Sequence, residues 1–116
     1  TVVNDQVVAP TATEDLARAI TELVVTDEYG TYHITNSGAC SYFEFTQTIY
    51  RKTGIDALVK PTSTGSYAAP AARPLYSVLD NSKFLTLGMA KMSSWEEALD
   101  AYLTQRLRNN STNGNN

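Results

Sequence analysis

Apolar residues recur at helical spacing in three stretches of the chain, and a Ser/Thr-x-x-Glu sequence precedes each stretch. Such a sequence is typical of a helix N-terminus, because its first side chain accepts a hydrogen bond from an unpaired backbone N–H group. The three pairs are Thr11 and Glu14, Ser41 and Glu44, and Ser94 and Glu97. With the spacing, they predict helices over about residues 12–24, 42–53 and 95–108.

The same spacing identifies the apolar side chains expected to face the core. They are Leu16, Ile20, Leu23 and Val24 in the first helix, Tyr42, Phe45 and Ile49 in the second, and Trp95, Leu99, Tyr102 and Leu103 in the third. Trp95 is expected to anchor the core, and a stacking role against a ligand is the alternative.

Short extended segments separate the helices. Apolar and β-branched residues predict strands at residues 2–4, 31–35, 57–60 and 77–79. Because helices alternate with strands, the predicted class is α/β, with three main helices and short strands. Residues 61–74 are rich in Ser, Thr, Ala, Gly and Pro and are expected to form a surface loop.

A fourth, short helix is predicted over about residues 80–87. Asp80 or Asn81 is expected to cap its start, Gly88 to end it, and Lys83 to lie on its surface. Direct contact of the Asp80-Asn81-Ser82-Lys83 motif with a ligand is the alternative.

The length of 116 residues fits one domain. We place this domain at residues 1–108 and expect residues 109–116, which are polar and of low complexity, to be a disordered tail. No apolar run approaches the roughly 20 residues that span a bilayer, so no membrane partner is expected. A single cysteine fits a reducing compartment, and we expect a cytoplasmic location.

The net charge of -3 argues against a nucleic-acid partner, because many lysines and arginines are needed to bind a phosphate backbone. The charge is unevenly distributed. Residues 1–50 carry seven acidic residues and one basic residue, whereas residues 51–91 carry six basic and two acidic residues. The basic stretch surrounds Arg73, and it is either a solvated surface or an anion site.

Residues suited to catalysis are few. His33 is the only histidine and has no partner at metal-ligand spacing, so no metal site is expected. Cys40 precedes a predicted helix, where thiol pKa values fall, but no base accompanies it and we expect a packed side chain. The six glycines contain no GxGxxG sequence for a nicotinamide cofactor, so no cofactor site is expected in this chain.

Three motifs resemble the C-terminal part of dTDP-4-dehydrorhamnose reductases, which belong to the extended short-chain dehydrogenase/reductases. The first runs from Val2 to Thr11, the second is the Gly30-Thr31-Tyr32-His33 strand pattern, and the third is Arg73-Pro74 with its continuation to Lys83. The resemblance covers residues 2–103. None of the seven tyrosines has a lysine four residues later, so the family's catalytic Tyr/Lys pair is absent from the chain.

The resemblance implies the substrate-binding domain of an enzyme that reduces a 4-keto sugar nucleotide with NADPH or NADH. The expected pathway is dTDP-rhamnose and cell-surface polysaccharide biosynthesis. The N-terminal Rossmann domain that would hold the cofactor and the Tyr/Lys pair is absent, so the chain alone is expected to be inactive. The expected partners are a dTDP-sugar and that Rossmann domain, with self-association through an apolar face left exposed.

The resemblance also names substrate-binding residues. In related enzymes an arginine matching Arg73 reaches the pyrophosphate, for which a planar guanidinium is suited; an internal carboxylate partner is the alternative. Asn4 and Gln6 are expected to line the ligand side of the first loop, although Gln6 alternatively stitches the loop together. Val8 stands where the family usually has glycine. If that position requires a positive φ or close approach to a ligand, a β-branched residue is strained there, and the loop or the fit of the substrate is expected to differ.

Two other functions fit the same resemblance. One is a non-catalytic binding or regulatory module, since a regulatory subunit of methionine adenosyltransferase has this fold. The other is part of a related sugar-nucleotide epimerase.

Overall fold

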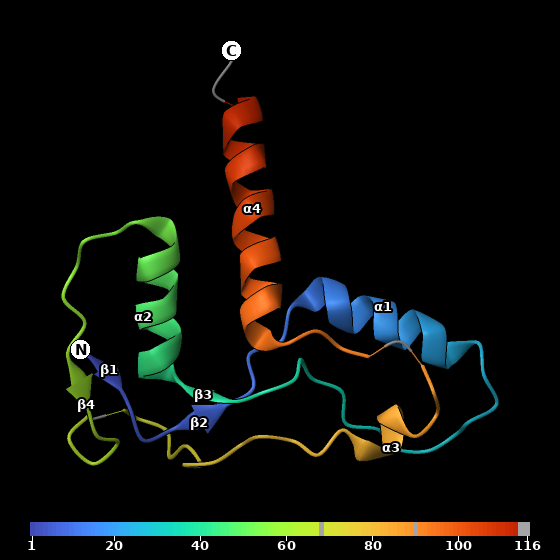
Figure 1. The fold of residues 1–116 in the computed structure, drawn as a ribbon. Helices are drawn as coiled ribbons and strands as arrows, with labels where there is room; N and C mark the ends of the chain where they lie inside the picture. Colours follow the sequence, from blue (N-terminus) through green and yellow to red (C-terminus); the bar gives the residue numbers. More distant parts are fainter. Residues whose placement is uncertain (68, 90, 114–116) are drawn as a thin grey trace.

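Four helices and four two-residue strands make up the computed structural model, which describes residues 1–67, 69–89 and 91–113. The helices are α1 (Thr13–Val24), α2 (Tyr42–Thr53), α3 (Ser82–Leu85) and α4 (Trp95–Asn113). The strands are β1 (Val2–Val3), β2 (Val7–Val8), β3 (Cys40–Ser41) and β4 (Pro61–Thr62). Figure 1 shows α2 and α4 standing side by side, with α1 running outward from the base of α4. The predicted α/β class is confirmed.

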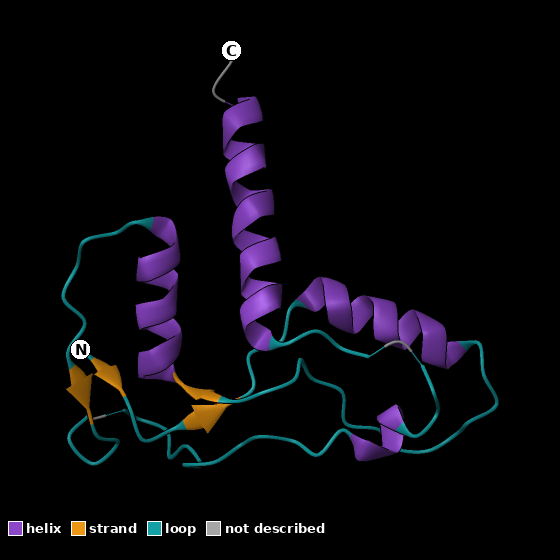
Figure 2. Ribbon diagram, in the orientation of Figure 1, coloured by secondary structure: helices purple, strands orange, loops and turns teal. Residues whose placement is uncertain are grey.

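The strands form two separate pairs near the N-terminus, shown in orange in Figure 2. β1 pairs in parallel with β4, so that Val2 lies opposite Pro61. β2 pairs antiparallel with β3, so that Val8 lies opposite Cys40. The first eight residues therefore hold both the start of the 61–74 segment and the entry to α2.

Two of the three predicted capping boxes supply the expected bond. The Ser41 hydroxyl accepts a hydrogen bond from the Glu44 N–H at 3.1 Å, and the Ser94 hydroxyl accepts one from the Glu97 N–H at 3.2 Å. In addition, the left-handed Gly54 (φ 71°) closes α2.

The predicted box at Thr11 is wrong. α1 begins after Ala12, whose N–H donates to the Asn36 side-chain oxygen at 2.7 Å. The Thr11 hydroxyl instead donates to the Ala9 carbonyl and accepts from the Asn36 N–H. The side chain of Asn36, 24 positions away in the sequence, thus binds an unpaired N–H group at the start of α1, a role that was expected of Thr11.

The core consists of two small clusters. One contains Ala19, Phe84 and Met92, with Leu23, Tyr32, Ile34 and Met89 packed against it. The other contains Cys40, Trp95 and Leu99, with Phe45, Ile49 and Leu103 packed against it. Trp95 is 8% exposed, and its ring packs edge-on against the Phe45 ring with the two ring centroids 5.9 Å apart. Its predicted role as a core anchor is confirmed.

Several side chains predicted to face the core are exposed: Ile20 by 50%, Val24 by 73%, Tyr102 by 53% and Tyr42 by 43%. Apolar spacing identifies an apolar face but not whether another element covers it. The radius of gyration is 17.1 Å, whereas a compact domain of this length has about 13 Å. The open shape leaves these faces of α1, α2 and α4 uncovered.

The predicted strands at residues 31–35, 57–60 and 77–79 are wrong. Tyr32 and Ile34 pack against the core as the alternation requires, but residues 31–35 pair with no strand in the described part of the chain. Residues 57–60 lie just before β4, which begins at Pro61. Next to residues 77–79, Tyr76 forms an isolated β-bridge with Val7.

The short helix α3 ends at Leu85, with turn residues continuing to the left-handed Gly88. Asn81 is the N-cap residue of α3 but makes no side-chain cap bond, and the Asp80 carboxylate, one residue earlier, accepts from the Ser82 N–H at 2.9 Å. Asn81 instead donates through its amide to the Thr35 side-chain and backbone oxygens. The side chains of Asp80 and Asn81 therefore form hydrogen bonds within the fold.

The predicted disordered tail is wrong over residues 109–113, because α4 continues to Asn113. Neither glycine nor proline interrupts the helix before Gly114, and the Ser111 hydroxyl donates to the Leu107 carbonyl at 3.0 Å. The rest of the predicted tail, residues 114–116, lies outside the described residues. Across the described part of the chain, no helix is long and apolar enough to cross a membrane.

Candidate functional site

The N-terminal segment binds both ends of the long loop that carries Arg73. At the near end, the Asn4 N–H donates to the Thr62 carbonyl at 2.9 Å. At the far end, the Val7 N–H donates to the Leu75 carbonyl at 2.8 Å and the Ser77 N–H donates to the Val7 carbonyl at 3.0 Å. The segment between these two anchors leaves and rejoins one short stretch of chain, so its described residues, 65–67 and 69–74, belong to an Ω-loop. This loop is the yellow-green segment beneath β1 and β2 in Figure 1.

A polar cluster closes the near end of the Ω-loop. The Thr64 N–H donates to both Asp5 carboxylate oxygens, at 3.0 and 2.9 Å, and the Thr64 hydroxyl donates to the same carboxylate at 2.6 Å. The Gln6 amide donates to the Thr64 hydroxyl oxygen at 3.2 Å. Hydrogen bonds from the Thr64 side chain and then its backbone lower the pKa of Asp5, so the carboxylate is ionised at neutral pH and the bonds are charge-assisted.

Arg73 is exposed on this loop. The ion pairs among the described residues join Arg18 to Asp15 and Lys52 to Asp100, so Arg73 has no carboxylate partner there. Its guanidinium presents its donors to solvent, where an anion can reach them.

The other two predicted site residues lie on the segment that holds the loop. Asn4 is exposed and is fixed through its backbone N–H. Gln6 is 8% exposed, and its amide nitrogen donates to the Thr64 hydroxyl oxygen, so it joins the N-terminal segment to the Arg73 loop rather than to its own backbone. Its place on the ligand side remains a prediction. Hydrogen bonds at Val7 join this segment to the return of the loop two residues after Arg73.

Val8 causes no backbone strain. It lies in β2 with its partner Cys40, and in the described residues only glycines have a positive φ. The conformation that would have required glycine at this position is therefore not adopted.

Two exposed aromatic rings on or beside the loop were not identified from the sequence. Tyr67 is 52% exposed and Tyr76 is 67% exposed, and the neighbouring Leu75 is 56% exposed. Exposed rings near a cationic side chain are suited to stacking on a nucleobase. The sequence feature that could have identified these rings is their place in or next to the Ser/Ala/Pro-rich segment that contains Arg73.

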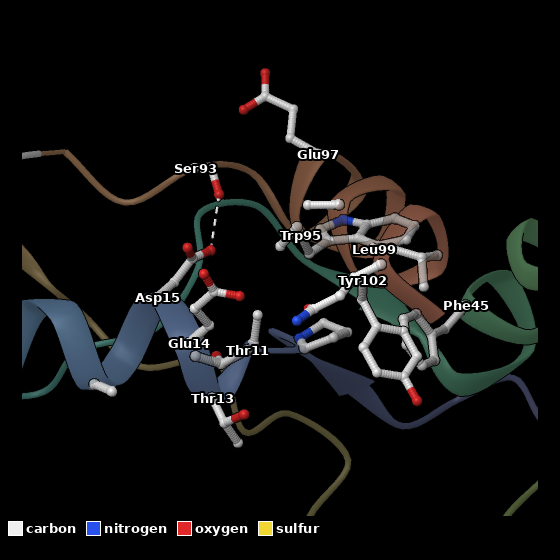
Figure 3. A pocket seen from close by; sticks show the side chains of 16 residues that line it. Thr11, Thr13, Glu14, Asp15, Phe45, Ser93, Trp95, Glu97, Leu99 and Tyr102 are labelled. Atoms are coloured by element: carbon white, nitrogen blue, oxygen red, sulfur yellow. Dashed lines mark hydrogen bonds between the residues drawn. The ribbon is translucent and has the colours of Figure 1, made fainter. Parts of the chain in front are cut away.

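A separate cavity of about 940 Å³ lies between the start of α1 and the first turns of α4. Figure 3 shows Trp95, Leu99, Phe45 and Tyr102 on its apolar side and the carboxylates of α1 and α4 near its rim. These carboxylates belong to Glu14, Asp15 and Glu97. Because like charges repel, this cavity is unsuited to a pyrophosphate.

Of the remaining reactive side chains, Cys40 is part of the core. Cys40 is 2% exposed; burial, followed by the nearby charges of Glu44 and Glu96, raises its pKa to about 11, so the thiol is protonated and packed as predicted. His33 is exposed, and the described residues contain no group of three His, Cys, Asp or Glu side chains placed to hold a metal ion.

Lys83 lies exposed on α3, as predicted, and contacts the Tyr32 ring. Its ammonium lies 4.6 Å from the centre of the Tyr32 ring, a cation–π contact. The glycine at position 30 leaves room for it, since a Cβ there would lie 2.6 Å from the Lys83 nitrogen.

Comparison with known proteins finds relatives that match most of this chain. Residues 1–108 match a family model described as the RmlD substrate binding domain. The spore coat polysaccharide biosynthesis protein SpsK of Bacillus subtilis is 38% identical over 105 residues, which is 90% of this chain and 36% of that protein. A dTDP-4-dehydrorhamnose reductase of Streptomyces griseus is 38% identical over 104 residues, covering 84% of this chain and 34% of the relative.

Solved structures have the same fold. The dTDP-4-dehydrorhamnose reductase of Bacillus anthracis in complex with NADP superimposes with a TM-score of 0.86 at 40% identity, over 90% of this chain and 37% of that one. Its counterpart from Clostridium acetobutylicum gives a TM-score of 0.85 at 42% identity, over 91% of this chain and 38% of that one. The chain thus spans little more than a third of the length of the relatives it matches.

Proposed function

The chain belongs to the RmlD substrate binding domain family, and from this premise we propose that it is the nucleotide-sugar-binding part of a dTDP-4-dehydrorhamnose reductase-like enzyme. The whole enzyme would reduce a 4-keto sugar nucleotide with NADPH or NADH, in the cytoplasm, during the synthesis of dTDP-rhamnose and cell-surface polysaccharide.

The observation that carries this proposal is the exposed Arg73 on a loop anchored at both ends. A guanidinium without a carboxylate partner can donate two parallel hydrogen bonds to the oxygens of a diphosphate. The exposed side chain of Asn4 would add a neutral donor or acceptor for the sugar or base, and Tyr76 would offer a stacking surface. Gln6 would act through the loop that it holds.

The chemical step would depend on residues outside this chain. Reduction places a hydride on C4 of the sugar and a proton on the resulting oxygen, and the 116 residues contain neither a glycine-rich cofactor turn nor a Tyr/Lys pair at the required spacing. This chain would bind the nucleotide and hold the sugar in place.

The uncovered faces of α1 and α4 support a second part of the proposal, that a Rossmann domain packs into the angle between these helices. Ala17 and Tyr102 line the cavity there, and Ile20 and Val24 continue the apolar stripe of α1 away from it. The relatives are about two and a half times as long as this chain, which leaves room for such a domain. In its absence these faces would promote self-association.

The direct test is calorimetric titration of the chain with dTDP and dTDP-rhamnose. We expect binding that Arg73→Ala weakens by at least about tenfold, or roughly 1.4 kcal/mol. Arg51→Ala removes an exposed arginine from α2 and is the matched control, which should bind as the unmodified chain does. Equal affinities for the Arg73→Ala variant and the unmodified chain would contradict the proposal.

A further inference from the structure

Thr64 occupies the position at which the Arg73 loop leaves the N-terminal segment. Four hydrogen bonds converge on this residue, three to Asp5 and one from Gln6. Its hydroxyl both donates to the Asp5 carboxylate and accepts from the Gln6 amide. Only a hydroxyl side chain can make both bonds from this place.

The far end of the loop is held mainly by backbone groups. The Val7 N–H donates to Leu75, and the Val7 carbonyl accepts from the Ser77 N–H and, at 3.5 Å, from the Ser77 hydroxyl. Asp5 and Val7 are two residues apart, which in extended chain is about 7 Å. The two anchors therefore lie close together and fix both ends of the ten-residue loop.

Within the loop itself the described contacts are few. The Ser66 and Tyr67 N–H groups donate to the Ser63 carbonyl, and the Ala69 N–H donates to the Tyr67 carbonyl. These contacts shape the first turn but do not reach Arg73. The placement of Arg73 thus depends on how firmly the two ends of the loop are anchored.

We infer that Asp5 and Thr64 are positioning residues, which hold the Ω-loop so that Arg73 meets the diphosphate of a nucleoside-diphosphate sugar. This inference rests on the proposed function and adds to it the residues that orient the arginine. Asp5 and Thr64 act through Arg73 and do not themselves touch the ligand. A loop ordered before binding loses less conformational freedom when the ligand arrives, so the anchor favours affinity.

A double-mutant cycle with dTDP as the titrant tests the inference. Thr64→Val keeps the shape of the side chain and removes both hydroxyl bonds, and we expect it to weaken binding about threefold to tenfold. Thr64→Ser restores the hydroxyl and should restore the affinity. In the Arg73→Ala background, Thr64→Val should have no further effect. Thr104→Val, at an exposed position of α4, is the matched control and should bind normally.

Hydrogen exchange provides a readout that is independent of the ligand. The backbone amides of residues 65–67, 69 and 71–73 should exchange faster in Thr64→Val than in the unmodified chain, while those of α2 and α4 should be unchanged. Arg73-dependent dTDP binding that Thr64→Val leaves intact would overturn the positioning role and leave the proposed function standing. An equal loss from Thr64→Val with and without Arg73 would overturn it as well. No binding by the unmodified chain would refute the proposed function and this inference together.

Discussion

The amide of Asn36 donates a hydrogen bond to the Asp15 carboxylate at 2.8 Å, and this pair joins segments that are distant in sequence. The same amide donates to the Ser93 carbonyl at 3.1 Å, and its oxygen accepts from the Ala12 N–H. Asn36 is 1% exposed. One buried side chain therefore connects the start of α1, the extended segment after it and the approach to α4.

Asn36→Ala should destabilise the chain by about 2–4 kcal/mol, because it leaves the Ala12 N–H and part of the Asp15 carboxylate without partners. Urea unfolding followed by the fluorescence of Trp95 measures the change. Asn109→Ala, at an exposed site on α4, should change the free energy of unfolding by less than about 0.5 kcal/mol. Equal stabilities for the two variants would contradict the role of Asn36.

The Asp15 carboxylate should make stability depend on pH. The hydrogen bond from Asn36, aided by Ser93 and Arg18, lowers the pKa of Asp15 in spite of partial burial. Because the folded-state pKa lies below the unfolded one, the contribution is full above about pH 4 and is lost as the pH falls through the folded-state pKa.

The free energy of unfolding should therefore fall less steeply between pH 5 and pH 2 in Asp15→Asn than in the unmodified chain. Glu14→Gln changes the neighbouring exposed carboxylate and should keep the unmodified slope. Parallel curves for Asp15→Asn and the unmodified chain would count against this contribution.

The Cys40 thiol should be unreactive in the folded chain. With its pKa raised to about 11 and its side chain buried, modification by a disulfide reagent at pH 8 should be at least about 100-fold slower than in urea. Absorbance of the released thiolate follows the reaction. Similar rates in the folded and unfolded chain would show that Cys40 is accessible and argue against its place in the core.

Gly38 and Gly54 both have a left-handed backbone conformation, so substitutions at the two positions compare the cost of backbone strain with the added cost of a packing clash. Gly38 has a φ of 83°, and a Cβ added there would lie 3.1 Å from the Trp95 ring, whereas Gly54 has a φ of 71° and open space around it. Gly54→Ala should cost about 1–2 kcal/mol from the backbone alone. Gly38→Ala should cost more, because the Trp95 ring must also shift. Urea unfolding compares the two, and equal losses would mean that Trp95 adapts without cost.

Local signals predicted the helices well. Ser41 and Ser94 cap their helices through neighbours three residues away, which is information that the sequence contains. The start of α1 was assigned to the wrong residue because Asn36, its true partner, is separated from it by a full helix and a loop. α4 is longer than predicted because polar composition alone does not break a helix.

The site was predictable only in part. The family resemblance indicated Arg73, Asn4 and Gln6, and the hydrogen bonds of Val7 with residues 75 and 77 explain how these distant positions share one region. The bonds of Thr64 with Asp5 and Gln6 were missed because they join side chains 58 and 59 positions apart, and a threonine in a polar loop gives no local signal.

The exposure of Ile20 and Tyr102 was missed for a different reason. Periodicity shows that a helix face is apolar, but the element that covers the face is not encoded in the helix itself.

The measurement that tests the central claim most directly is a chemical-shift titration of the isotopically labelled chain with dTDP-rhamnose. The account predicts shifts confined to residues 4–7 and 64–77, with none in the cavity between α1 and α4, and their loss in Arg73→Ala. Shifts centred on the cavity residues Trp95 and Tyr102, or shifts at the loop that persist without Arg73, would contradict it.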